Sequence, residues 1–517
     1  MATTQRVIRN VLSNSAGKII TLGINLLLTP VLVWHLGAAN YGLLTVIGSV
    51  ATYGSLLDFG MLNTVIKYVA EYRARHDHHN ASTVIGTALV VYSLTGLVAV
   101  VLSVALAPAI PRLFNIADAD RLTATRLVIV SGIGLGLSLP CAIVTAVLRA
   151  LQRYDLVNAV SVVGSLLYAG AMIAIVQLGG GVLGVAVSGV AALLIAQLPG
   201  VWLVKRIAPE LHLGWRTADR RMARKLLSFS SWLFVNDAAG LLQMKTDVVV
   251  IGALLPIAAV TPYAVCLKLS RIPKILTDQF VKVLLPLASE LHASDDEQRL
   301  RTLYVWSSRL TLAIFVPFGC TIAMLGSDAL TVWMGPEYGS YWPLVAVLVF
   351  ALGLDMAQWP AGSILQGTAR VRAMALVAAA TGIANLVLSI VLARRFGLIG
   401  VALGTLIPTA LASLAVVMPY SMRKIGVPAI EMVKDVMWPS LLPAIPAVMV
   451  LYALRSSFAP LTLVPLAGIA VAGIATYYVT YISMGASPSE QQTYRTFALG
   501  SMRRVDAYLR GQPYAER

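Results

Sequence analysis

Apolar residues occur along this chain in runs of about 20, the length that a helix needs to cross a bilayer. Short connections rich in Gly, Pro, Asn or charged residues separate these runs. The pattern predicts about fourteen membrane-spanning helices, near residues 11–34, 43–67, 83–107, 122–148, 156–177, 182–204, 227–254, 260–288, 303–325, 341–366, 373–393, 398–420, 436–454 and 461–484. We therefore expect an all-α polytopic membrane protein.

The segment 260–292 departs from this pattern, because it combines a membrane-spanning length with charged side chains. The charged residues are Lys268, Arg271, Lys274, Asp278 and Lys282. On one continuous helix they fall within an arc of about 120°. A charge that meets hydrocarbon costs at least ~2.5–3.5 kcal/mol, so we expect this arc to line a water-filled space with protein walls. The alternative is that Lys268 and Lys282 extend to the membrane edges and that Asp278 is a structural partner.

Other polar side chains inside the apolar runs concentrate in the first, second and seventh runs. The first run carries a stripe at helical spacing, made of Asn14, Lys18, Thr21 and Asn25. Such a stripe either faces the same space or holds neighbouring helices together. The second run contains Asp58, and the seventh contains Lys245 and Asp247. Asp355, in the tenth run, is the main exception to this distribution.

The composition and the distribution of charge agree with a membrane protein. Of the 517 residues, 58% are hydrophobic and 12% are charged, and the mean hydropathy is +0.80. The net charge of +16 could indicate a nucleic-acid binder. However, Lys and Arg gather in alternate short connections, where they orient helices, so we discount nucleic acid. Because this alternation keeps one phase along the chain, we expect an even number of spans and two cytoplasmic termini.

The two halves of the chain repeat each other weakly. Gly181 to Ala186 matches Gly397 to Ala402, Arg153 matches Arg370, and Glu71 approximately matches Glu290. These pairs share an offset of about 215–220 residues, which predicts two six-helix lobes related by a parallel repeat. The expected division is an N-terminal lobe at 1–204, a basic cytoplasmic linker at 205–226, a C-terminal lobe at 227–422, two extra spans at 423–484 and a cytoplasmic tail at 485–517.

Several of these stretches resemble a known family. LGAANYG follows the first run, LLDFGMLNTVIKYVAEYRAR closes the second, and VTPYAV and LLPLASEL begin and end the eighth. They resemble the Wzx-type bacterial polysaccharide flippases of the multidrug/oligosaccharidyl-lipid/polysaccharide exporter superfamily. The resemblance implies a V-shaped cavity lined by spans 1, 2, 7 and 8. It also implies export of oligosaccharides linked to undecaprenyl pyrophosphate across the bacterial inner membrane, for O-antigen, capsule or exopolysaccharide synthesis.

The polar positions then divide into two candidate groups. A pyrophosphate needs cationic donors in a partly desolvated space, so we expect the substrate to be bound by Lys18, Asn25, Lys245, Lys268, Arg271 and Lys274. Asp58, Asp247 and Asp278 are candidates either to bind Na⁺ or H⁺ as the coupling ion or to pair with Lys and Arg. Expected partners are membrane lipids and, for the pathway, a polysaccharide polymerase and a chain-length regulator.

Three other functions are less compatible with the sequence. A flippase for the peptidoglycan lipid precursor shares the same physics and stays open as the nearest alternative. A drug exporter of the same superfamily needs an anionic cavity, which the eighth run opposes. An enzyme needs catalytic residues outside the membrane, but we find no triad, carboxylate pair or phosphate-binding Gly loop. The three cysteines indicate no metal site, and His76 to His79 fit a solvated loop better than a metal centre, so we expect no bound cofactor.

Overall fold

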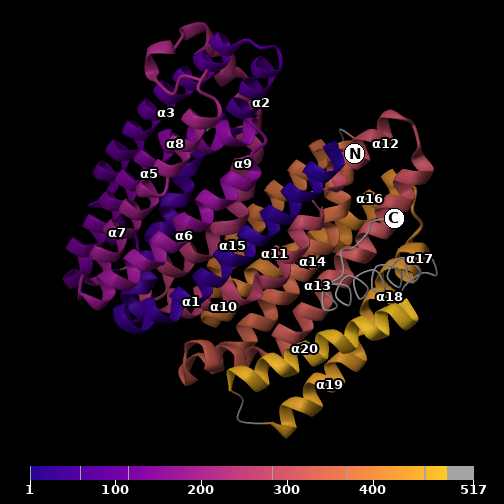
Figure 1. Ribbon diagram of the computed structural model, residues 1–517. Helices are drawn as coiled ribbons and strands as arrows, with labels where there is room; N and C mark the ends of the chain where they lie inside the picture. Colours follow the sequence, from indigo (N-terminus) through magenta and orange to yellow (C-terminus); the bar gives the residue numbers. More distant parts are fainter. Residues whose placement is uncertain are drawn as a thin grey trace, which may run out of the picture. The chain divides into compact units, whose positions relative to one another are not determined.

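The structure is a computed structural model that describes residues 2–58, 60–114, 116–281, 283–368, 371–458 and 462–485 (Figure 1). Within these residues every regular element is a helix. The chain divides into two compact units, the first formed by Met1–Lys268 with Ala375–Pro408 and the second by Leu269–Met374 with Thr409–Arg517. The predicted lobes are defined by the sequence repeat, whereas these units are defined by compactness. The lobe boundaries therefore stay a prediction.

The first unit is built from long helices joined by short connections. Its helices are α1 (Ala2–Tyr53), α2 (Met61–Ala74), α3 (His78–Leu106), α4 (Ile110–Leu113), α5 (Arg121–Ala150), α6 (Tyr154–Gln177), α7 (Gly181–Ile195), α8 (Leu198–Ile207), α9 (Arg220–Leu254), most of α10 (Val260–Ser270) and most of α15 (Val371–Ala410). The long helix α1 contains a kink at Gly37, where φ is 76°, a backbone conformation that glycine adopts without strain.

The second unit contains the remaining helices. They are α11 (Ile272–Val281), α12 (Leu284–Ala293), α13 (Glu297–Met334), α14 (Trp342–Gly367), α16 (Met418–Ile425), α17 (Ala429–Glu431), α18 (Trp438–Leu441), α19 (Ala444–Ser457) and α20 (Leu463–Thr480). Three π-helical stretches, Leu411–Val417, Met432–Met437 and Tyr481–Gly485, adjoin α16, α18 and α20.

Ten helical segments of the described chain are long and apolar enough to cross a membrane. Two of them, Ile20–Asp58 and Ala373–Ile425, each cover two of the predicted spans. The apolar character extends to the surface, since Leu94, Leu97 and Val101 on α3 are all exposed. A helix that exposes large apolar side chains in this way is suited to contact lipid. The all-α expectation is confirmed.

The predicted span at 260–288 is not one continuous helix, so the prediction of a single charged arc is wrong in its geometry. It consists of α10, α11 and α12, and Arg271 lies between the first two. Pro273 explains the first interruption, because its ring cannot donate a backbone hydrogen bond and clashes with the preceding turn. Lys282, the last member of the predicted arc, lies outside the described residues.

The predicted linker is folded onto α3 as part of the first unit. Ser82 on α3 accepts a hydrogen bond from the backbone N–H of His212 at 3.1 Å, and its carbonyl accepts one from Thr217 Oγ1 at 2.9 Å. The approach is close, since a Cβ on Gly86 would lie 2.6 Å from the carbonyl oxygen of Gly214. Leu211 from this segment is buried in the core that α2, α3 and α5 share.

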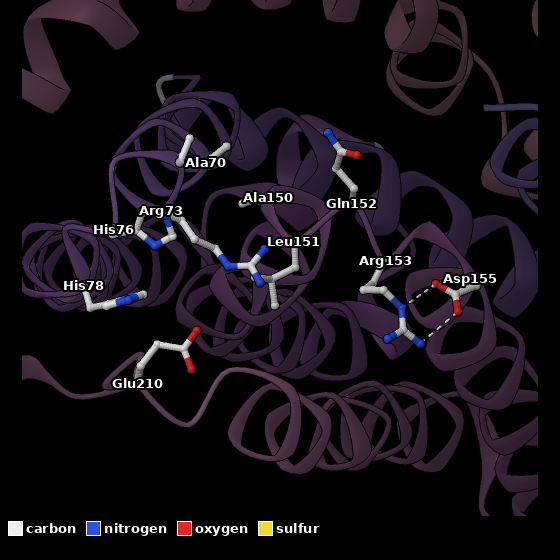
Figure 2. A pocket seen from close by; sticks show the side chains of 11 residues that line it. Ala70, Arg73, His76, His78, Ala150, Leu151, Gln152, Arg153, Asp155 and Glu210 are labelled. Atoms are coloured by element: carbon white, nitrogen blue, oxygen red, sulfur yellow. Dashed lines mark hydrogen bonds and ion pairs between the residues drawn. The ribbon is translucent and has the colours of Figure 1, made fainter. Parts of the chain in front are cut away.

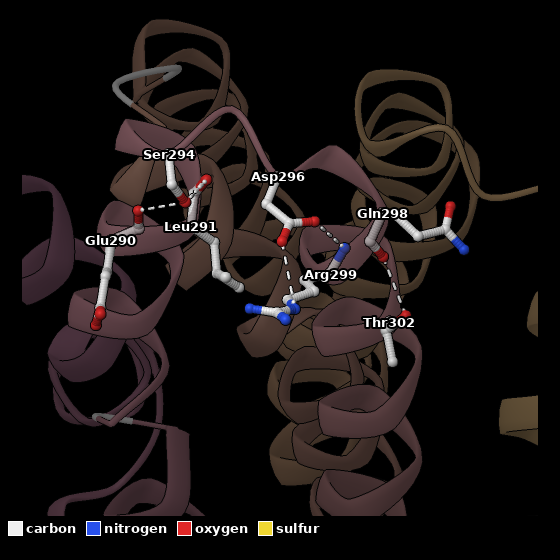
Figure 3. A network of polar contacts seen from close by, with 7 residues as sticks. All are labelled: Glu290, Leu291, Ser294, Asp296, Gln298, Arg299 and Thr302. Atoms are coloured by element: carbon white, nitrogen blue, oxygen red, sulfur yellow. Dashed lines mark hydrogen bonds and ion pairs between the residues drawn. The ribbon is translucent and has the colours of Figure 1, made fainter.

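Two turns in different units have the same local structure. Between α2 and α3, His76 adopts φ 57° and Asp77 caps α3 by accepting a hydrogen bond from the N–H of Asn80 at 3.0 Å. Between α12 and α13, Asp295 adopts φ 52° and Asp296 caps α13 by accepting from the N–H of Arg299 at 3.0 Å (Figure 3). The corresponding positions differ by the predicted offset of about 215–220 residues, which supports the internal repeat.

Candidate functional site

Lys268, on α10, lies in a cradle of hydroxyl groups supplied by α1. Its ammonium donates to Thr29 Oγ1 and to Tyr41 Oη, both at 2.8 Å. Thr29 and Tyr41 are buried, and Thr29 in turn donates to the carbonyl of Asn25 at 2.6 Å. Both partners of the ammonium are neutral, so these hydrogen bonds orient the charge without cancelling it. Such an ammonium can still attract an anion.

Asp247, on α9, is the acceptor at the end of a chain of hydrogen bonds in the first unit. Tyr263 Oη donates to its Oδ2 at 2.6 Å, and Thr405 Oγ1 donates to its Oδ1 at 3.1 Å. Asn385 then donates its amide to Thr405 Oγ1 at 2.9 Å. Asn385 and Tyr263 are buried. Helices α9, α10 and α15 therefore place a carboxylate and two hydroxyl oxygens together, a set that suits either a proton or a hard cation such as Na⁺.

Asp58 adjoins α2 and is held by α3. Tyr92, on α3, donates its hydroxyl to Asp58 Oδ1, and the backbone N–H of Leu62 donates to the same oxygen at 3.3 Å. Tyr92 is almost fully buried in the core between α2, α3 and α5. The carboxylate thus joins the start of α2 to the middle of α3.

Lys274, on α11, is the centre of a charged cluster in the second unit. Its ammonium lies 3.3 Å from Asp278 Oδ1 and 3.4 Å from the centroid of the Trp359 ring. Trp359 donates its indole N–H to Asp355 Oδ2 at 3.2 Å. Lys274 is only 6% exposed, so burial has placed this cation between a carboxylate and an aromatic face instead of in water.

The other predicted residues are distributed as follows. Asn25, on α1, is exposed and donates its side-chain amide to the carbonyl of Thr21 at 2.8 Å. Lys18, also on α1, and Arg271, between α10 and α11, are half-buried. The side chain of Lys245, on α9, lies outside the described residues.

The structure joins the predicted residues to partners but does not test a single common cavity. Lys268 contacts α1, Asp247 contacts α10 and α15, and Lys274 contacts Asp278. The first two lie in one unit and the third lies in the other. One cationic space formed by all of them therefore stays a prediction.

Sequence reasoning missed the hydroxyl and aromatic partners of these charges. Tyr41 and Tyr263 were both visible, because each is the tyrosine of a matching motif, NYG after the first span and PYA at the start of the eighth. Tyr41 accepts from a lysine, whereas Tyr263 donates to an aspartate. Trp359 lies one turn after Asp355, and that i, i+4 spacing was a readable signal for their contact.

Two curated relatives cover different shares of the chain. The "Uncharacterized membrane protein EpsK" of Bacillus subtilis (strain 168) is 22% identical over 409 residues, covering 76% of this chain and 79% of that protein. The "Probable low-salt glycan biosynthesis flippase Agl15" of Haloferax volcanii is 22% identical over 209 residues, covering 40% of this chain and 42% of that protein.

Solved structures of two transporter types share the fold. An inward-facing multidrug resistance MATE family transporter of the MOP superfamily matches with a TM-score of 0.70 and 15% identity, over 79% of this chain and 94% of that one. The lipid II flippase MurJ in an inward closed conformation matches with a TM-score of 0.68 and 13% identity, over 90% of this chain and 97% of that one. At such identities the likeness shows the fold alone.

Both of these solved structures are of membrane transporters, and this chain shares their fold. The resemblance drawn from the sequence motifs is confirmed at the level of family by a direct match. The family model described as "Polysaccharide biosynthesis protein" matches residues 31–343, which is more than half of the chain. The chain therefore belongs to the polysaccharide biosynthesis protein family.

Proposed function

We propose that the protein flips oligosaccharide repeat units linked to undecaprenyl pyrophosphate across the bacterial inner membrane, for O-antigen, capsule or exopolysaccharide synthesis. The observation that carries this proposal is the polysaccharide biosynthesis family match across residues 31–343. Two likenesses support it: Agl15 is named as a glycan biosynthesis flippase, and MurJ as a lipid II flippase. The distribution of Lys and Arg supports a cytoplasmic position for both termini.

Recognition of the pyrophosphate rests on the cations within the apolar helices. Lys268 is the best placed of these, because in the described part of the chain its ammonium is held by neutral hydroxyls and pairs with no carboxylate. Lys18, Asn25, Lys245, Arg271 and Lys274 complete the proposed binding set. The polyprenyl tail stays in lipid while the charged group crosses through the protein by alternating access, so no ionised group has to enter hydrocarbon.

The driving force is an ion gradient, the membrane potential or both. An interior-negative potential favours outward movement of an anion by about 2.3 kcal/mol per charge per 100 mV. It also favours the return of an empty, positively charged site toward the cytoplasm. Of the three candidate coupling residues, Asp247 has the most suitable surroundings for Na⁺ or H⁺, whereas Asp278 pairs with Lys274 and Asp58 accepts from Tyr92.

A flippase for the peptidoglycan lipid precursor is the second candidate function. The MurJ structure favours it, because the fold matches over 90% of this chain. A flippase of this kind moves the same kind of headgroup. Complementation of strains that lack one or the other flippase must therefore separate the two candidate functions. A multidrug exporter is disfavoured, because the uncompensated charge of Lys268 would repel a cationic drug.

The decisive experiment reconstitutes the purified protein in liposomes that contain a fluorescent glycan on undecaprenyl pyrophosphate. The potential and the Na⁺ and H⁺ gradients are imposed one at a time. We expect flipping to accelerate when the side holding the substrate is made negative. If an ion gradient also accelerates flipping, we expect the Asp247→Asn variant to lose that dependence on the ion. The same assay is run with the peptidoglycan lipid precursor as substrate. If the protein flips this precursor and not the glycan, the second candidate function is the correct one. The absence of glycan flipping under every gradient would reject the first.

A further inference from the structure

A polar cavity of about 930 Å³ opens at one end of the first unit, away from the residues assigned above to transport. Three connections meet there: the turn between α2 and α3, the turn between α5 and α6, and the segment after α8. The polar side chains around it are Arg73, His76, His78, Gln152, Arg153, Asp155 and Glu210 (Figure 2). Its volume is within the range of about 300–1,000 Å³ that is typical of small-ligand sites.

The two arginines of this cavity differ in what they already bind. Arg153 is fixed by Asp155, with its Nε 3.0 Å from Oδ1 and its Nη2 3.0 Å from Oδ2. Arg73 has no hydrogen-bond or ion-pair partner for its guanidinium among the residues that the structure describes, and Figure 2 shows it extending across the cavity above Leu151. The fork of Arg73 is therefore available to a ligand, beside a second guanidinium that is held in place.

The carboxylate of Glu210 and the ring of His78 also line this cavity. Glu210 lies across from Arg73 in Figure 2, and the described chain gives its carboxylate no donor. His78 contributes a buried Nδ1 atom that has no hydrogen-bond partner in the described residues. Three groups on three different segments thus present hydrogen-bonding capacity to one cavity, and the buried Nδ1 of His78 is costly unless a ligand or water completes it.

We propose that this cavity binds a phosphate ester that also carries hydroxyl or ammonium donors. A planar guanidinium binds phosphate oxygens in a bidentate way, and Arg73 presents such a guanidinium to the cavity. Glu210 then accepts hydrogen bonds from the donors of the same ligand. A bare anion would leave the carboxylate of Glu210 without a donor, and a simple cation would leave the guanidinium of Arg73 without an acceptor. The source is either a soluble sugar phosphate or a phospholipid headgroup.

The test measures binding of two soluble probes to the full-length protein in phosphatidylcholine nanodiscs. Glucose 1-phosphate supplies phosphate and hydroxyl donors, whereas inorganic pyrophosphate supplies only the anion. We expect saturable binding of glucose 1-phosphate that Arg73→Gln weakens on the order of tenfold. Glu210→Gln should strengthen the binding of pyrophosphate, because it removes a repelling charge, and should reduce the preference for glucose 1-phosphate over pyrophosphate.

Arg75→Gln is the matched control. Arg75 belongs to the same turn, but it is exposed, pairs with Glu71 at 2.9 Å and does not line the cavity. A second arm measures the thermal stability of the protein in nanodiscs that contain phosphatidylglycerol. Stabilisation that depends on Arg73, without binding of the soluble ester, assigns the ligand to a lipid headgroup. Equal losses in Arg73→Gln and Arg75→Gln, or no saturable effect of any probe, would overturn the proposal.

Discussion

Lys268 and Lys274 lie six positions apart in the chain, yet they have opposite surroundings. Lys268 donates to two neutral hydroxyls on α1, whereas Lys274 faces the carboxylate of Asp278 and the ring of Trp359. The hydroxyl cradle leaves the charge of Lys268 available to a passing anion. The cluster around Lys274 already compensates its charge, so any contact of this lysine with substrate comes in addition to a role in holding helices α11 and α14 together. Charges on one predicted stripe can therefore have different roles.

The strongest test of this contrast removes the compensated lysine. Lys274→Ala leaves Asp278 and its neighbour Asp355 without their cation in an enclosed site. Removing one partner of a buried pair costs about 3–5 kcal/mol, so we expect a lower unfolding temperature, reduced accumulation in the membrane and loss of transport. Thermal unfolding of the detergent-purified protein measures the effect.

The double variant Lys274→Ala with Asp278→Asn serves as the control for that change. It removes both charges of the pair, and we expect it to recover part of the lost stability. A double variant no more stable than Lys274→Ala would show that the ion pair is not the source of the effect.

Removing the uncompensated lysine should instead separate transport from stability. Lys268→Ala leaves two neutral hydroxyls, which can bond to water, so we expect near-normal accumulation. The rate of glycan flipping in liposomes should fall at least tenfold, since a charge-assisted contact to the pyrophosphate is lost. Lys268→Arg should retain more activity than Lys268→Ala because it keeps the positive charge. Full flipping by Lys268→Ala would place substrate recognition elsewhere.

The smallest expected effect comes from the cradle itself. Tyr41→Phe removes one acceptor of the Lys268 ammonium but keeps the ring and the charge. The ammonium keeps its charge and its bond to Thr29, so we expect only a several-fold slower rate at unchanged abundance. Tyr263→Phe, the corresponding change beside Asp247, should alter ion dependence more than substrate affinity. Indistinguishable behaviour of the two variants would contradict the separation of the sites.

The sequence predicted the helices and the positions of the charges because hydropathy and charge are local properties of the chain. It also contained the signal for the break at Arg271, since Pro273 follows two residues later. The partners of the charges could not be predicted in the same way. Thr29 and Tyr41 are more than 200 positions from Lys268, and only the packing of α1 against α10 brings them into contact. Asp355 looked like an exception until the fold placed it beside Trp359 and Lys274.

The turns at His76 and Asp295 have the same local structure in the two halves of the chain. One backbone turn and one Asp cap recur in both halves at the same offset, a pattern that duplication of a smaller gene would produce. Each residue then has a counterpart in the other half against which its specialisation can be judged. The turn of the first half borders the cavity for which we propose a ligand, whereas its counterpart carries the Asp296 cap, the ion pair of Asp296 with Arg299 and the hydrogen bonds of Ser294.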